Sequence, residues 1–252
     1  MIRPGRLALS EAPAALKVAT YNIHGAVGCD RRYAAERIAR VLLELDADIV
    51  ALQEVPLGGA RGERDNVLTL LSESGGYYAA EGPTIDMPGR RYGNAVLSRY
   101  PIRAVRNINL AIQSREPRGA LDADIECRRH MVRVVATHLG LGAAERSHQV
   151  ECLLQAFDTR DMPVILLGDL NEWLVWGQPL RRLLTHFLRG RAPATFPTWW
   201  PLFALDRIWI HPGEALREVS VHRSALARIA SDHFPLLARI DWPPRANQER
   251  GG

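Results

Sequence analysis

Polar side chains that could bind a metal ion or move a proton stand at the ends of several apolar segments. In VILLGDLNEW (164–173), four apolar residues precede a cluster that includes Asp169, Asn171 and Glu172. The comparable positions elsewhere are Asn22 in TYNIHG, Glu54 in VALQEV, His138 in VVATHL, Asp206 in LDRIWI, and Asp232 and His233 in ASDHF. Each alone is compatible with ordinary turn chemistry. Their recurrence at strand ends predicts one shared site at the rim of a sheet.

These residue types suit the hydrolysis of a phosphodiester. Carboxylates with an amide form the hard oxygen site that Mg²⁺ or Mn²⁺ prefers. An Asp–His pair beside such a metal can stabilise charge on the phosphoryl oxygens, while another carboxylate activates water. The chain has no HExxH motif and no Cys/His cluster, which disfavours zinc, and no GxxxxGK[ST] motif, which disfavours ATP or GTP hydrolysis.

Hydrophobic periodicity indicates the elements that must position these residues. The expected strands are 16–23, 47–53, 93–99, 102–110, 119–127, 131–139, 164–168, 205–211, 217–223 and 235–241. The expected helices are 33–45, 64–74, 143–157 and 178–189. This order opens as βαβ and then has a run of strands. Two sheets packed face to face, with helices outside, fit that order better than a single parallel sheet.

The composition is that of an ordinary globular protein. The 252 residues are 47% hydrophobic and 24% charged, which fits one α/β domain, expected over residues 16–242. Residues 1–15 and 243–252 are rich in Pro, Gly, Ala and charge, and we expect them to be loose tails. The protein is expected to be monomeric.

The three cysteines argue against a disulfide framework or a structural zinc site. Cys29, Cys127 and Cys152 are odd in number and have no CxxC spacing, which predicts a reducing compartment. The N-terminal segment lacks the apolar core of a secretory signal, and no apolar run approaches a membrane span. A cytoplasmic protein is therefore expected.

Arginine supplies nearly all of the positive charge. The net charge is +4, and Lys17 is the single lysine. The planar guanidinium group suits phosphate, so the positive net charge gives weak support for an anionic substrate. An excess of arginine over lysine can also reflect genome base composition. RGERDN (61–66) and MPGRRYGN (87–94) are candidate phosphate-facing loops.

Several motifs occur in the order known from one large family. The segments are TYNIHG, DIVALQEV, YGNAVLSRYPI, PRGAL, ATHLGL, VILLGDLNEW, LDRIWI and SDHFPLLARI. From residue 17 to residue 240 the chain resembles the endonuclease/exonuclease/phosphatase superfamily, which includes deoxyribonuclease I, abasic endonucleases, neutral sphingomyelinases and inositol polyphosphate 5-phosphatases. The resemblance implies a four-layer α/β/β/α sandwich of two mixed sheets, and a Mg²⁺-dependent phosphoesterase in which Mn²⁺ is an alternative cofactor.

The resemblance also implies a role for each matching residue. Glu54 is expected to be the main metal ligand, with Asn22 and Asp232 as its partners. The expected catalytic residues are Asp169 as the residue that orients or deprotonates water, His233 as the imidazole facing the scissile phosphate, Asp206 as the carboxylate that orients His233, and His138 as a second histidine. The expected phosphate contacts are Asn171, Asn94 and Arg118, with Arg115 as a rival to Arg118.

The sequence motifs do not distinguish among several classes of phosphoester substrate. The abasic endonuclease branch often has an acid where this chain has His24, whereas TYNIHG and THLGLGAAERSHQVECL are closer to small bacterial hydrolases near the sphingomyelinases. A phosphodiesterase acting on nucleic acid or a phospholipid headgroup is favoured. A phosphomonoesterase acting on a small metabolite and a non-catalytic scaffold are the alternatives, and the intact set of polar residues disfavours the scaffold.

Exposed aromatic residues near the site would favour a phospholipid substrate. PTWWPLF (197–203) places Trp199, Trp200 and Phe203 just before Asp206, either as a lipid-facing loop with peripheral membrane contact or as a cover for a sheet edge. Trp173 and Trp176 are expected to pack in the core or at the rim.

Overall fold

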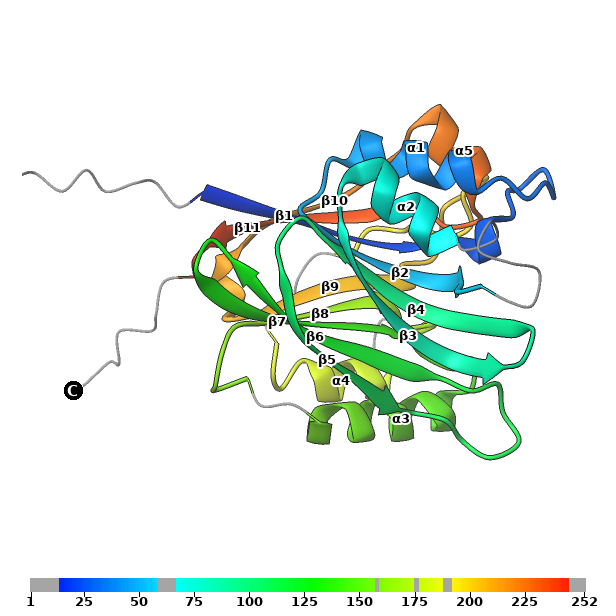
Figure 1. The fold of residues 1–252 in the computed structure, drawn as a ribbon. Coiled ribbons are helices and arrows are strands. Elements are labelled where there is room, and N and C mark those ends of the chain that lie inside the picture. The colour runs from blue at the N-terminus through cyan, green and yellow to red at the C-terminus, as the bar shows by residue number, and fades with distance from the viewer. Residues whose placement is uncertain (1–13, 59–66, 157–158, 175–176, 188–191, 245–252) are drawn as a thin grey trace, which may run out of the picture.

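The computed structural model describes residues 14–58, 67–156, 159–174, 177–187 and 192–244. They form two mixed β-sheets that pack face to face, with helices on the outer faces (Figure 1). The first sheet has the order β10-β11-β1-β2-β4-β3 and the second has the order β5-β6-β7-β8-β9. This is the expected four-layer sandwich.

The strands have the following bounds. Those of the first sheet are β1 (Ala14–Asn22), β2 (Ile49–Pro56), β3 (Tyr78–Met87), β4 (Arg90–Ser98), β10 (Leu216–Val221) and β11 (Leu236–Trp242). Those of the second are β5 (Ile102–Asn109), β6 (Gly119–Cys127), β7 (His130–His138), β8 (Val164–Asp169) and β9 (Asp206–His211). Only β1–β2 and β7–β8 pair in parallel within the described chain.

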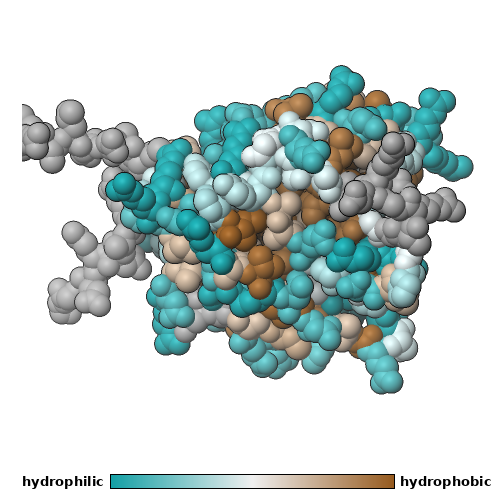
Figure 2. Space-filling view, viewed as in Figure 1, coloured by the Kyte–Doolittle hydropathy of each residue, from teal (hydrophilic) through white to brown (hydrophobic). Residues whose placement is uncertain are grey.

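Helices cover both outer faces. On the upper sheet of Figure 1 lie α1 (Ala35–Leu45), α2 (Val67–Gly75) and α5 (Ala225–Ala230), and under the lower sheet lie α3 (Ala143–Ala156) and α4 (Gln178–Leu183). Three buried apolar clusters correspond to the two helix–sheet interfaces and to the space between the sheets. The face seen in Figure 2 is mostly hydrophilic, with apolar residues gathered near the middle. Among the described residues, no helix is both long and apolar enough to cross a membrane.

Strand register brings the polar strand ends together. In the parallel pair β7–β8, His138 lies opposite Asp169, and in the antiparallel pair β8–β9, Asp169 lies opposite Asp206. In the other sheet, Asn22 at the end of β1 lies opposite Gln53, one residue before Glu54. The strands β1 and β8 also pack against each other across the sandwich. The polar residues at the strand ends of the two sheets therefore meet at one rim.

Two backbone features shape this rim. Glu54 has φ +59° and lies at a register shift between Leu52 and Val55. This β-bulge changes the direction in which the Glu54 side chain points. Gly168 has φ +151°, and a Cβ there would lie 1.9 Å from the carbonyl oxygen of Thr137. Glycine at this position therefore allows β7 and β8 to lie close together just before Asp169.

Some expected element boundaries were wrong. The hairpin of β3 and β4 was not expected before residue 93, because Gly82, Pro83 and the turn at Gly89 weaken its strand signal. The helix expected over 178–189 ends at Leu183, and the six-residue α5 is too short for a clear helical period. The strand β1 begins at Ala14, inside the expected tail.

Candidate active site

Glu54 and Asn22 form one half of the site. The Asn22 amide donates from Nδ2 to Glu54 Oε1 at 2.9 Å, and the Tyr92 hydroxyl donates to Glu54 Oε2 at 2.9 Å. Burial alone would raise the pKa of Glu54, but these two hydrogen bonds help to bring it below its usual value. Glu54 is therefore an ionised carboxylate at neutral pH.

His233 and Asp206 form the other half. His233 Nδ1 lies 2.8 Å from Asp206 Oδ2, which also accepts a 2.5 Å hydrogen bond from the Thr195 hydroxyl. Burial favours a neutral imidazole, but the carboxylates of Asp206 and Asp169 outweigh it and raise the pKa of His233 to about 10. His233 is thus an imidazolium at neutral pH.

Asp169 joins the two halves. Its Oδ2 accepts a 3.1 Å hydrogen bond from Asn22 Nδ2 and lies 3.7 Å from His233 Nε2, while its Oδ1 accepts from the Asn171 backbone N–H at 2.9 Å. Burial opposes ionisation, but the His233 imidazolium and these hydrogen bonds together lower the pKa of Asp169. The site therefore holds an ionised aspartate between Glu54 and a cationic imidazole.

His138 has a different protonation state from His233. Arg118 Nη1 lies 3.1 Å from His138 Nδ1, and Asn171 Nδ2 lies 3.0 Å from His138 Nε2, so a hydrogen-bond donor faces each ring nitrogen. That Nε2 is 3.5 Å from Asp169 Oδ2. Burial lowers the pKa of His138, and Arg118 adds to this. Burial and these two donors favour the neutral imidazole, so His138 differs from His233 in charge.

The other expected site residues differ in how closely they contact this cluster. Asn171 Nδ2 lies 3.0 Å from His138 Nε2 and donates to the carbonyl of Leu139 at 2.9 Å. Asn94 donates to the carbonyl of Gly119, and thereby ties β4 to β6. Asp232 is one-third exposed and lies 3.9 Å from His24 Nδ1.

The structure separates the two candidate arginines. Arg118 is buried against His138, and its Nη2 also donates to Glu116 at 3.0 Å, whereas Arg115 is exposed in the preceding loop. In the 87–94 segment, Arg91 pairs with Glu81 and Asp86. The 61–66 loop and Trp176 lie outside the described residues.

Two contacts at the candidate site were not expected from the sequence. Tyr92 stands in the YGN motif and faces Glu54 because Pro56 pairs with Tyr92 across β2 and β4, a register that periodicity alone does not give. Thr195 lies in a loop and reaches Asp206 through tertiary packing, so nothing in its local sequence marks it.

The donor set of the first half fits a hard divalent cation. Asp169, Asp206 and His233 also offer ligand atoms within 4.8 Å of one another, but a protonated imidazole cannot bind a metal. Glu54 and Asp169 offer carboxylate oxygen atoms on either side of the Asn22 amide, as Mg²⁺ or Mn²⁺ prefers. Asn22 directs Nδ2 at both carboxylates while its Oδ1 accepts from the His24 backbone N–H, so the amide would have to turn for this oxygen to bind a metal between them.

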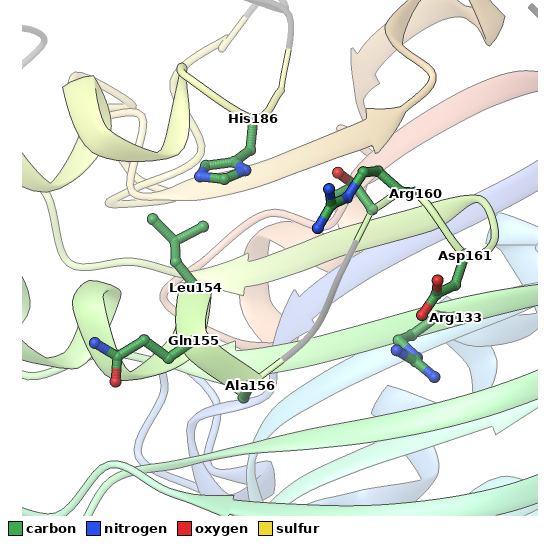
Figure 3. Close-up of a pocket in the computed structure, with 8 residues that line it drawn as sticks. Arg133, Leu154, Gln155, Ala156, Arg160, Asp161 and His186 are labelled. Atoms are coloured by element: carbon green, nitrogen blue, oxygen red, sulfur yellow. The ribbon is translucent and has the colours of Figure 1, made fainter.

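A pocket elsewhere has no role in this chemistry. It has a volume of about 670 Å³ and lies near the end of α3, and Figure 3 shows the side chains of Arg133, Arg160, Asp161 and His186 around it. Arg133 already pairs with Asp122 and Asp124. None of the candidate site residues lines this pocket.

The His233–Asp206 pair predicts that the stability of the metal-free protein depends on pH. Because the pKa of His233 rises from 6.5 to about 10 on folding, its stabilisation is complete below pH 6.5 and is lost as the pH rises towards 10. Urea unfolding at several pH values should show this decline. His233→Asn should remove it, whereas an unchanged decline in that variant would contradict the assignment.

The family comparison agrees with this geometry. Residues 19–233 match the model of the Endonuclease/Exonuclease/phosphatase family. The chain belongs to this family. Members of the Endonuclease/Exonuclease/phosphatase family are hydrolases that act on phosphoester bonds, and they generally depend on a divalent metal.

Individual relatives support the same assignment. "Uncharacterized protein YbhP" of Escherichia coli is 31% identical over 243 residues, which cover 89% of this chain and 95% of that protein. An endonuclease/exonuclease/phosphatase from Beutenbergia cavernae is 24% identical with a TM-score of 0.75, covering 90% of this chain and 71% of that one. The mannosyl-6-phosphatase of Bacteroides thetaiotaomicron is 19% identical with a TM-score of 0.67, covering 88% and 98% respectively. The two structural likenesses show a shared fold.

Proposed function

We propose that this protein is a divalent-metal-dependent phosphodiesterase that cleaves a P–O bond by in-line attack of water. The observation that carries the proposal is the position of Asp169. Its carboxylate lies between the Glu54–Asn22 pair and the imidazolium of His233, so an acceptor for a water proton adjoins both a metal-type donor set and a fixed positive charge.

Each residue has a distinct part in this proposal. Asp169 orients the attacking water and accepts its proton, and His233, held by Asp206, stabilises negative charge on the phosphoryl oxygens. His138 contributes a neutral imidazole that is held between Arg118 and Asn171. Asn171 is proposed as a phosphate-binding amide, and Arg118 and Asn94 support that side of the site.

The metal would be held by Glu54 and Asn22, with Asp232 as a further proposed ligand. When bound, Mg²⁺ or Mn²⁺ would act as a Lewis acid on a phosphoryl oxygen. Tyr92 would keep the Glu54 carboxylate in place through its 2.9 Å hydrogen bond.

Phosphomonoester hydrolysis is the second candidate. It is supported by the fold shared with a mannosyl-6-phosphatase, and by Arg118 as a buried cation that could face a dianionic phosphate. We further propose a reducing, cytoplasmic location, because all three cysteines are free and Cys29 is exposed.

A comparison of two chromogenic substrates tests this proposal. With Mg²⁺, the protein should hydrolyse bis-p-nitrophenyl phosphate with a higher kcat/KM than p-nitrophenyl phosphate, and EDTA should abolish both reactions. A higher kcat/KM for the monoester would favour the second candidate. Equal rates with and without EDTA would contradict metal dependence.

A further inference from the structure

A short hairpin exposes two tryptophans next to the catalytic segment. Phe196 and Phe203 form an antiparallel bridge, and the turn between them is closed by a hydrogen bond from the Trp200 N–H to the carbonyl of Pro197. At this turn Trp199 is 74% exposed and Trp200 is 62% exposed. Of the two alternatives for this segment, a lipid-facing loop and a cover for a sheet edge, the exposure of Trp199 and Trp200 favours the first.

This hairpin is fixed to the active site by backbone and ring contacts. The N–H of Thr198 donates to the carbonyl of Asp232 at 2.9 Å, and the N–H of Phe234 donates to the carbonyl of Thr195 at 2.9 Å. The ring of Phe196 lies 4.7 Å from the imidazole of His233. The exposed tryptophans thus have a defined position relative to the catalytic imidazole.

Other exposed apolar side chains adjoin the hairpin. Trp173 packs edge-on against Phe203, with ring centroids 4.8 Å apart, and the next residue, Leu174, is 68% exposed. The buried Arg146 bonds both Glu172 and the carbonyl of Leu141, so the exposed Leu141 belongs to the same region. We name these residues the apolar rim: Leu141, Trp173, Leu174, Trp199, Trp200, Leu202 and Phe203.

Positive charge flanks the apolar rim. Arg228 donates to the carbonyl of Thr198 at 2.8 Å. The loop that carries the exposed Arg31 and Arg32 is anchored to the hairpin, since Cys29 Sγ lies 3.3 Å from the Thr198 hydroxyl. The acidic residue of that loop, Asp30, is already neutralised by two hydrogen bonds from Arg37.

The exposed apolar side chains and the flanking arginines together favour a membrane surface as the partner. Stacking on nucleic-acid bases needs aromatic rings, but three members of the apolar rim are leucines, which gain nothing from stacking. Exposed tryptophan and leucine with flanking arginine are the side chains that enter the interface of an anionic bilayer. A rim of this kind also needs a fixed orientation relative to the site, which the hairpin contacts supply.

We propose that the apolar rim docks onto an anionic phospholipid bilayer and presents the active site to the headgroup phosphodiesters. The lipid substrate rests on the phosphodiesterase proposed above, whereas docking itself does not. Hydrolysis would break a P–O ester bond of the headgroup by addition of water, which leaves a phosphomonoester and an alcohol.

Vesicle binding tests the proposal. The full-length protein should sediment with vesicles of phosphatidylcholine and phosphatidylglycerol, and binding should fall by at least about tenfold in Trp199→Ser/Trp200→Ser, since each indole contributes apolar area at the interface. Tyr78→Ser is the matched control, because Tyr78 is 54% exposed at the opposite end of its sheet, where it pairs with Ser98. That variant should bind as well as the wild type.

The same proteins separate docking from catalysis. The double variant should keep the wild-type rate on soluble bis-p-nitrophenyl phosphate and lose activity only on vesicles. Absent vesicle binding, equal binding by the double variant, or binding of a single-stranded oligonucleotide that depends on both tryptophans would overturn the proposal. Vesicle binding by a protein that hydrolyses no phosphoester would refute the proposed function and the lipid substrate, but retain docking.

Discussion

The variant His233→Asn is expected to lower kcat for a phosphodiester by about 10²–10³-fold, the usual effect of removing one preorganised group that stabilises transition-state charge. The imidazolium is held at 2.8 Å by Asp206 and lies 3.7 Å from Asp169, so its charge is fixed before substrate binds. Asparagine can still donate a hydrogen bond but carries no charge. The loss should therefore appear mainly in kcat, with a smaller change in KM.

A matched control shows whether the effect is local. His222→Asn removes another histidine that pairs with a carboxylate, because His222 Nε2 lies 2.9 Å from the partly exposed Glu44. This variant should keep wild-type kcat, and circular dichroism should show both variants folded. A folded His233→Asn protein with wild-type kcat would mean that His233 has no catalytic role.

The variant Glu54→Gln is expected to weaken Mg²⁺ binding by more than about 10–100-fold, which is the cost usually seen when an outer partner of a metal ligand is removed. Glu54 is the ionised carboxylate of the proposed metal site, and glutamine preserves its size while removing the charge. Isothermal titration with Mg²⁺ and the Mg²⁺ dependence of the rate should shift together. The fold should be retained, since the amide can still bond Asn22 or Tyr92.

Two further variants sharpen this test. Tyr92→Phe removes only the hydrogen bond to Glu54 Oε2 and should have an intermediate effect on Mg²⁺ binding. Glu126→Gln removes a partly exposed carboxylate that pairs with Arg103, and it should have no effect on Mg²⁺ binding. Unchanged Mg²⁺ affinity in Glu54→Gln would place the metal elsewhere, for example at Asp169 and Asp206.

The sequence predicted the sandwich because its buried strands are long and apolar and end in polar residues. The segment VILLG and its neighbours pair so that His138, Asp169 and Asp206 fall in one row, as their positions at strand ends indicated. The family motifs then predicted the fold class. The hairpin of β3 and β4 was missed in part, since an edge strand with Pro83 lacks a strong strand pattern.

The detailed state of the site could not be predicted from the sequence. The two histidines differ because Arg118 donates to His138 while two carboxylates face His233, and these contacts join residues far apart in the chain. The same holds for Thr195, which reaches Asp206 from a loop. Such contacts depend on tertiary packing, which a pattern of strands and helices does not specify.

Hydrolysis of bis-p-nitrophenyl phosphate in H₂¹⁸O with Mg²⁺ tests the central claim most directly. If water activated beside Asp169 attacks phosphorus, the product p-nitrophenyl phosphate should carry one ¹⁸O and the released p-nitrophenol none, and Asp169→Ala should abolish the incorporation. Label in the p-nitrophenol, or undiminished incorporation in the folded Asp169→Ala protein, would contradict it.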